Sequence, residues 1–167
     1  MKLSNEIAAV VTGGASGLGE ATARAFATKG VKVGIFDMNE ERGAKVAKEI
    51  GGRFVKVNVA DEASVDAGFE VVRAANGTER LLINCAGIGL GMKTASRKRD
   101  TGAILAHDVA AYKRVLDINL FGSFLCASKS AAAMMALEPT DPDGERGLIV
   151  NTASCLLYTS PSPRDRG

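Results

Sequence analysis

The amino-acid sequence predicts an α/β fold, in which a doubly wound parallel sheet carries helices on both faces. Short, nearly continuous apolar segments alternate along the chain with longer segments whose apolar residues recur at helical spacing. Strands that are apolar throughout are typical of a parallel sheet, because such a sheet is buried on both sides. With 167 residues, 46% of them hydrophobic, the chain is long enough to form one domain with its own core.

The elements follow one another in a regular order. Strands are expected at residues 6–12, 31–36, 53–59, 81–84 and 147–151, and helices at 17–29, 40–50, 61–75 and 108–137. Glycines mark the element ends, Gly30 closes the first helix, and Asp61 is a suitable N-cap for the third. Residues 87–101 have no clear pattern and are basic. Because crossovers between parallel strands are right-handed, we expect five strands in the order 3-2-1-4-5, a Rossmann-type sheet.

The composition excludes several classes of partner. Lys and Arg number 21 against 19 Asp and Glu, and neither sign forms a block, so neither nucleic acid nor a membrane surface is expected as a partner. No apolar run approaches the roughly 20 residues that cross a bilayer. The N-terminus does not resemble a secretory signal, so a cytoplasmic protein is expected.

Metal and disulfide chemistry are not expected either. The three cysteines, Cys85, Cys126 and Cys155, are isolated from one another, and His107 is the single histidine. We interpret His107 as a solvated residue at a helix start rather than a catalytic base, because no nucleophile motif accompanies it.

A glycine-rich turn joins the first strand to the first helix. Its sequence is Thr-Gly-Gly-Ala-Ser-Gly-Leu-Gly at residues 12–19. Glycines allow a sharp turn and a close approach of the backbone to a pyrophosphate, which free N–H groups and the helix dipole then stabilise. A purely structural turn is the alternative, but the preceding strand and the following helix favour a dinucleotide site.

Asp37 comes directly after the second strand, at the position where an acidic residue accepts hydrogen bonds from an adenosine ribose. Its carboxylate would repel a 2′-phosphate, and the neighbouring Met38 offers no guanidinium to bind one. The sequence therefore favours NAD over NADP. An ordinary aspartate in a turn at the strand end is the alternative.

Four motifs together resemble the short-chain dehydrogenase/reductase family over residues 5–154. They are T-G-x-x-x-G-L-G at 12–19, N-C-A-G at 84–87, D-I-N-L around Asn119 and N-T-A-S at 151–154. Within the family the chain is similar to the type II 3-hydroxyacyl-CoA dehydrogenase group. This similarity depends on the N-T-A-S motif, on Cys85 in place of a second asparagine, and on the segments near Lys93 and at 138–147.

The resemblance implies a set of cofactor-binding residues. Ser16 and Leu18 would line the phosphates, Asn58 and Val59 would contact adenine, and Cys85 would lie beside the nicotinamide ribose. The full set is Gly13, Ser16, Gly17, Leu18, Gly19, Asp37, Asn58, Val59, Asn84, Cys85, Ala86 and Gly87. Asn58 replaces the aspartate usual in the family, but its amide oxygen still accepts a hydrogen bond. A reactive thiol at Cys85 is the alternative to small-residue packing against the cofactor.

The resemblance also implies two catalytic residues. Ser154 would hydrogen-bond the substrate oxygen, and Asn119 would hold a proton-relay water through a local distortion of its helix; a purely structural asparagine is the alternative. The family's general acid/base is a tyrosine thirteen residues beyond the serine, with a lysine four residues later. Here that position is Gly167, and the residue four beyond Tyr158 is Ser162, so neither role can be assigned.

Residues 155–167 break the pattern in the middle of a motif. Their sequence resembles a translated sequencing adapter, so we expect a non-native tail there; an authentic divergent terminus is the alternative. Residues 1–154 would then form an NAD-binding Rossmann domain, the N-terminal portion of a family domain whose C-terminal part is missing.

The predicted function follows from the resemblance. We expect an NAD-dependent oxidoreductase that interconverts a secondary alcohol and a ketone, with a 3-hydroxyacyl-CoA as the favoured small-molecule substrate. The full-length parent is expected to be a homo-oligomer. The alternatives are a hydroxysteroid or 3-oxoacyl-thioester reductase and, in a different class, a dinucleotide-binding module without turnover.

Overall fold

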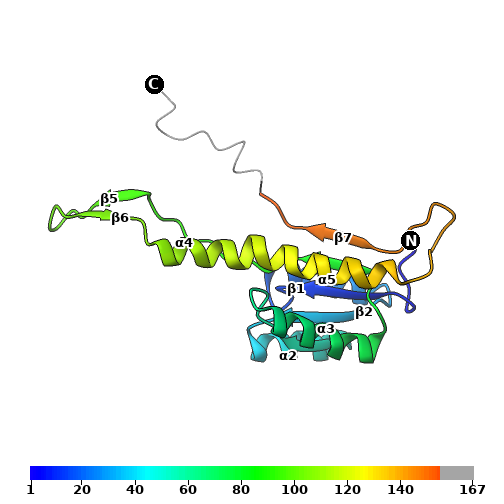
Figure 1. The fold of residues 1–167 in the computed structure, drawn as a ribbon. Helices are drawn as coiled ribbons and strands as arrows, with labels where there is room; N and C mark the ends of the chain where they lie inside the picture. Colours follow the sequence, from blue (N-terminus) through cyan, green and yellow to red (C-terminus); the bar gives the residue numbers. More distant parts are fainter. Residues whose placement is uncertain (155–167) are drawn as a thin grey trace, which may run out of the picture.

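The computed structural model describes residues 1–154, which form a parallel sheet with helices on both faces (Figure 1). The sheet strands are β1 (Ala8–Thr12), β2 (Lys32–Asp37), β3 (Arg53–Lys56), β4 (Leu81–Asn84) and β7 (Leu148–Asn151). Their order is β3-β2-β1-β4-β7, and every neighbouring pair is parallel. This confirms the predicted Rossmann-type sheet, since β7 is the fifth strand expected from the sequence.

The helices bury the two faces of the sheet in separate clusters. They are α1 (Gly17–Ala27), α2 (Glu40–Ile50), α3 (Glu62–Asn76), α4 (Val109–Leu116), the π-helix η1 (Asp117–Gly122) and α5 (Ser123–Met135). One cluster packs Val11 of β1 with α1 and α2, and the other packs Val10 with α3 and α5. Successive strand residues thus face opposite cores, which explains why the strands are apolar throughout.

Local capping fixes several of the predicted boundaries. The Asp61 side chain accepts a hydrogen bond from the Ser64 amide at 2.7 Å, which confirms it as the N-cap of α3. Gly51 ends α2 in the left-handed conformation, with φ of +66°. Asp108 caps α4 by accepting from the amides of Ala110 and Ala111.

A hairpin forms within the segment that the sequence left without a pattern. Strands β5 (Ala95–Arg97) and β6 (Ile104–Ala106) pair antiparallel and project beyond the end of α4, away from the sheet (Figure 1). Gly102 enables the turn with φ of +70°, and its amide donates to the Lys98 carbonyl at 3.0 Å.

His107 is less solvated than expected. It is half-buried, its ring meets Tyr112 edge-on at 5.9 Å between centroids, and Nδ1 is buried with no partner among residues 1–154. The expectation of a solvated side chain is wrong, because the ring packs at the junction of β6 and α4. No group of three or more His, Cys, Asp or Glu side chains within the described part of the chain could hold a metal ion.

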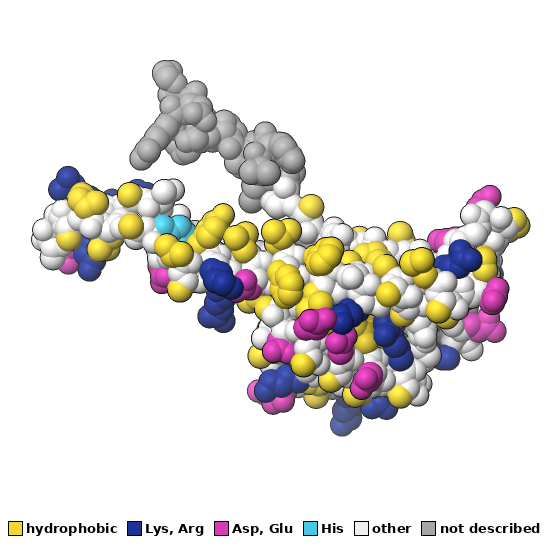
Figure 2. All heavy atoms as spheres, viewed as in Figure 1, with side chains coloured by type: hydrophobic (Ala, Val, Ile, Leu, Met, Phe, Trp, Pro, Cys, Tyr) yellow, Lys and Arg dark blue, Asp and Glu magenta, His cyan; other side chains and the backbone are white. Residues whose placement is uncertain are grey.

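Helices α4 and α5, joined by η1, expose an apolar face. Leu120 is 67% exposed and Phe124 67% exposed, and Figure 2 shows the hydrophobic side chains gathered along these helices. None of the helices in residues 1–154 combines the length and apolar character needed to cross a membrane.

A buried ion pair joins α3 to the segment before β4. Glu79 is 0% exposed, and its carboxylate accepts from Arg73 Nε at 2.9 Å and Nη2 at 2.8 Å. The Arg73 guanidinium lies 4.5 Å from the centroid of the Phe69 ring and also donates to the Lys129 carbonyl of α5. Two parallel hydrogen bonds from one guanidinium offset the free-energy cost of removing the carboxylate from water.

We predict that Glu79→Gln lowers the free energy of unfolding by about 2 to 4 kcal/mol, because it removes the negative charge that pairs with the Arg73 guanidinium. Urea denaturation measures the change. The control is Glu40→Gln, which breaks an exposed pair with Lys56 and should cost much less. Equal losses in the two variants would contradict a stabilising role for the buried pair.

Candidate functional site

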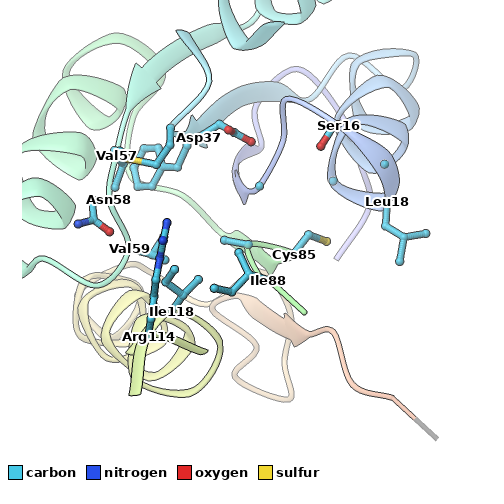
Figure 3. A pocket seen from close by; sticks show the side chains of 17 residues that line it. Ser16, Leu18, Asp37, Val57, Asn58, Val59, Cys85, Ile88, Arg114 and Ile118 are labelled. Atoms are coloured by element: carbon cyan, nitrogen blue, oxygen red, sulfur yellow. The ribbon is translucent and has the colours of Figure 1, made fainter. Parts of the chain in front are cut away.

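A cleft of about 480 Å³ opens where the loops after β1, β2, β3 and β4 meet (Figure 3). Ligands of open α/β sheets bind at this edge, outside the carboxyl ends of the strands. The lining residues are Gly13, Ser16, Gly17, Leu18, Gly19, Phe36, Asp37, Met38, Val57, Asn58, Val59, Cys85, Ala86, Gly87, Ile88, Arg114 and Ile118.

The glycines of the turn have distinct structural tasks. A Cβ on Gly13 would lie 2.8 Å from the backbone of Cys85 and Ala86, so this position allows β1 and the loop after β4 to approach closely. Gly19 lets the first turn of α1 pack on Gly13, since its Cβ would lie 2.2 Å from the Gly13 carbonyl oxygen. Gly17 has φ of +55°, and a Cβ there would meet nothing within 4 Å. Gly17 thus leaves the cleft wall open.

The N-terminus of α1 directs polar backbone groups to the cleft. Ser16 is the N-cap, its side chain makes no capping bond, and the Glu20 amide is bonded to the Ser16 carbonyl at 3.1 Å. The amides of residues 17–19 precede this bond and have no acceptor within the helix. Together with the helix dipole, they favour an anion in the cleft.

Asp37 is fixed beside the glycine turn. Its Oδ2 accepts from the Ala15 amide at 3.0 Å, and its Oδ1 accepts from the Asn39 amide at 2.9 Å. A carboxylate has about four lone-pair positions, so both oxygens keep acceptor capacity for a ligand. Asp37, the acidic residue that the sequence predicted after the second strand, is therefore a hydrogen-bond acceptor held in a fixed position at the cleft.

Thr12 is a positioning residue that sequence reasoning missed. The side chain is buried, and Oγ1 accepts from the amides of Cys85 at 3.2 Å and Ala86 at 3.1 Å. Oγ1 also donates to Asn84 Oδ1 at 3.4 Å. The sequence feature that could have indicated this role is a polar residue at the end of an otherwise apolar strand.

Asn84 lies behind the cleft, whereas all the other predicted cofactor-binding residues line it. Its side chain is buried, and Nδ2 donates to Asn151 Oδ1 at 2.9 Å and to the Ser123 carbonyl at 3.2 Å. The amide thus ties β4 to β7 and α5. Its position supports the loop that carries Cys85 rather than a direct contact with a ligand.

Asn119 lies in the π-helix η1, so the local distortion expected around it is present. Its Oδ1 accepts from the Ile88 amide at 2.8 Å, and its Nδ2 donates to the Ile88 carbonyl at 2.9 Å. These two bonds hold the loop after β4 against the helix, which is a structural role for the asparagine. Its water-holding role stays a prediction.

Ser154 is exposed and follows β7 at the last described position. The chain before it continues along β4, since the Thr152 amide donates to the Asn84 carbonyl at 3.0 Å. Ser154 is not among the lining residues of the cleft. The expected non-native tail, with Cys155, Tyr158, Ser162 and Gly167, lies outside the described residues.

Arg114 and Ile118 also line the cleft and were not predicted. They are four residues apart, so helical spacing places them on one face of the helix.

The two cysteines among the described residues, Cys85 and Cys126, lie in different surroundings. Cys85 lines the cleft, whereas burial in the core raises the pKa of the Cys126 thiol to about 12, which keeps it neutral.

The sheet order and the glycine-turn cleft define a Rossmann-type α/β protein. The family model described as short chain dehydrogenase matches residues 7–160, and the chain belongs to this family. It is 41% identical over 151 residues to "3-hydroxyacyl-CoA dehydrogenase type-2" of Drosophila melanogaster, covering 89% of this chain and 57% of the relative. This confirms the resemblance seen in the sequence.

Two further comparisons extend the similarity. The chain is 37% identical over 161 residues to "(-)-isopiperitenol/(-)-carveol dehydrogenase, mitochondrial" of Mentha piperita, covering 94% of this chain and 55% of the relative. The solved 3-hydroxyacyl-CoA dehydrogenase type-2 from Mycobacterium avium superposes with a TM-score of 0.75 at 34% identity, covering 95% of this chain and 60% of that chain. The chain therefore spans just over half the length of these relatives.

We predict that Gly13→Ala lowers the free energy of unfolding more than Gly17→Ala does. Both positions have positive φ, which costs alanine about 1 to 2 kcal/mol. Only at Gly13 would the new methyl group also meet the Cys85 and Ala86 backbone. Gly51→Ala is the matched control, because it combines φ of +66° with open space at the end of α2. Measured by urea denaturation, Gly17→Ala and Gly51→Ala should lower the free energy of unfolding by similar amounts. Equal losses for Gly13→Ala and Gly17→Ala would contradict the close approach of the backbone at Gly13.

Proposed function

We propose that this protein is an NAD-dependent oxidoreductase that interconverts a secondary alcohol and a ketone, with a 3-hydroxyacyl-CoA as the favoured substrate. The observation that carries the proposal is the Asp37 carboxylate, fixed by the Ala15 and Asn39 amides beside an open glycine turn. An acidic acceptor next to a helix N-terminus suits a dinucleotide whose ribose carries free hydroxyls.

The residues present fit a dinucleotide. The Gly17 position leaves the space beside the turn open, and residues 17–19 line the cleft with amides that have no acceptor within the helix. Val57, Val59 and Met38 offer apolar surface at the ends of β2 and β3, where a flat base would bind. When bound, NAD supplies the group that accepts or donates the hydride.

Each part of the cleft has a separate role in this proposal. The α1 amides hold the pyrophosphate, and Asp37 accepts from the ribose hydroxyls while repelling a 2′-phosphate. Asn58 and Val59 bind adenine, with the Asn58 oxygen as a hydrogen-bond acceptor. Cys85, Ala86 and Gly87 lie beside the nicotinamide ribose, where small residues allow close packing.

The substrate proposal rests on similarity and on charge. Relatives named as 3-hydroxyacyl-CoA dehydrogenases match most of this chain. The segment after Ile88, which includes the β5–β6 hairpin, exposes the cations Lys93, Arg97, Lys98 and Arg99, which suit a substrate bearing phosphates. In this proposal the Ser154 hydroxyl orients the substrate oxygen, and Asn119 holds a water for proton transfer.

The assembly of the parent protein belongs to the same proposal. We expect copies to associate through the exposed apolar face along α4, η1 and α5, because an apolar surface of this kind is stabilised by a partner.

We predict that the chain binds NAD more tightly than NADP, and that Asp37→Ala reduces the difference between the two affinities. Loss of a hydrogen bond to a charged partner should weaken NAD binding roughly tenfold or more. Isothermal titration calorimetry measures both cofactors. Asp37→Asn is the matched control, since it keeps oxygen acceptance for the Ala15 amide but removes the charge that repels a 2′-phosphate. Tighter binding of NADP by the unaltered chain would overturn the assignment.

A second prediction concerns turnover. The 167-residue chain should bind NAD but not reduce it with 3-hydroxybutyryl-CoA, because Gly167 stands where the family's tyrosine would be. A chain continued after Ser154 with that tyrosine, and a lysine four residues later, should gain at least the hundredfold to ten-thousandfold that general acid/base catalysis contributes.

In the continued chain, Ser154→Ala should lower kcat and leave the NAD dissociation constant unchanged, since Ser154 acts on the substrate oxygen. Absorbance of NADH at steady state reports the rate. Binding without turnover in the continued chain would support the cofactor-binding module instead.

A further inference from the structure

Arg114 brings a cation into the cleft from α4. The residue lines the cleft together with Asn58, Val59 and Met38, which belong to the opposite, sheet side. Figure 3 shows its side chain rising from the helix toward the part of the cleft where Asn58 and Val59 lie. Ile118, one helical turn further on, places an apolar side chain beside it.

The Arg114 guanidinium has no protein partner within the described residues. No carboxylate of residues 1–154 lies within 4.0 Å of it, and its side chain donates no hydrogen bond to them. Among the other arginines, Arg24 pairs with Glu20 and Glu49, Arg73 pairs with Glu79, and Arg80 donates to two carbonyls. Arg53 and Arg99 have no side-chain partner among residues 1–154 either, but they lie outside the cleft. The neighbouring Lys113 is paired with Asp117. Arg114 therefore keeps its full bonding and stacking capacity for a ligand.

The chemistry around Arg114 favours a flat, neutral ring rather than an anion. Val57, Val59, Met38 and Ile118 make this part of the cleft apolar. The Asp37 carboxylate in the same cleft disfavours an additional phosphate on the ribose. A guanidinium is planar and weakly hydrated, so it stacks on aromatic faces, whereas an ammonium does not stack in this way.

We propose that Arg114 is a specificity-determining residue for the adenine base: its guanidinium stacks on one face of the ring and closes the pocket formed by Asn58 and Val59. The inference rests on the proposed dinucleotide function and deepens it. It assigns adenine recognition to α4 in addition to the strand ends.

The test compares Arg114→Ala, Arg114→Phe and Arg114→Lys in the full 167-residue chain, with ADP-ribose as ligand and calorimetry at low and high salt. Arg114→Ala should weaken binding about 3- to 30-fold. Arg114→Phe should recover most of this loss, because a phenyl ring restores stacking without charge. Arg114→Lys should recover less than Arg114→Phe at both salt concentrations.

Two controls separate this inference from the proposed function. Lys113→Ala removes a neighbouring charge outside the cleft and should leave the affinity unchanged. No binding of ADP-ribose to the unaltered chain would defeat the proposed function itself. If the unaltered chain binds, equal affinity of Arg114→Ala would overturn the inference alone. Recovery by lysine but not by phenylalanine would also overturn it, because it would show an ion pair with phosphate.

Discussion

The close approach of the end of β1 to the loop after β4 is the contact on which the cleft depends. Gly13 makes it sterically possible, because any larger residue would collide with the backbone of Cys85 and Ala86. The Thr12 hydroxyl makes it favourable, because it accepts from both of their amides. The Cys85 amide is shared between this hydroxyl and the Thr12 carbonyl, each at 3.2 Å, whereas the Ala86 amide bonds the hydroxyl at 3.1 Å. The glycine turn begins at this point, Gly19 of α1 packs on Gly13, and Asp37 bonds the turn through the Ala15 amide.

The loop after β4 is held from its far side as well. Asn119 bonds both backbone groups of Ile88, and the π-helix η1 sets the position of that side chain. Asn84 ties the strand beneath to Asn151 of β7. Residues 85–88 therefore form a rigid wall between the glycine turn and the helix that carries Arg114. Preorganisation of this kind lowers the entropy that a ligand would lose on binding.

The fold and the near wall of the cleft could be predicted because their signals are local. Apolar periodicity gave the five strands, right-handed crossovers gave their order, and glycines with one aspartate marked the ligand edge. The hairpin β5–β6 was not predicted, because its strands are three residues long and exposed, and its pairing depends on Gly102.

Side-chain direction was the other limit. The N-C-A-G motif predicted Asn84 as a cofactor-binding residue, but only the fold shows that its amide bonds Ser123 and Asn151. Arg114 and Ile118 were not predicted, because the sequence shows only that a helix carries them and not which element that helix faces. The central claim, a dinucleotide site at the carboxyl edge of the sheet, is tested most directly by titrating the labelled chain with NAD and following backbone amide chemical shifts. The account predicts the largest changes at residues 17–19, 37–38, 58–59 and 85–88. Changes confined to residues outside the cleft lining, or no changes at all, would contradict it.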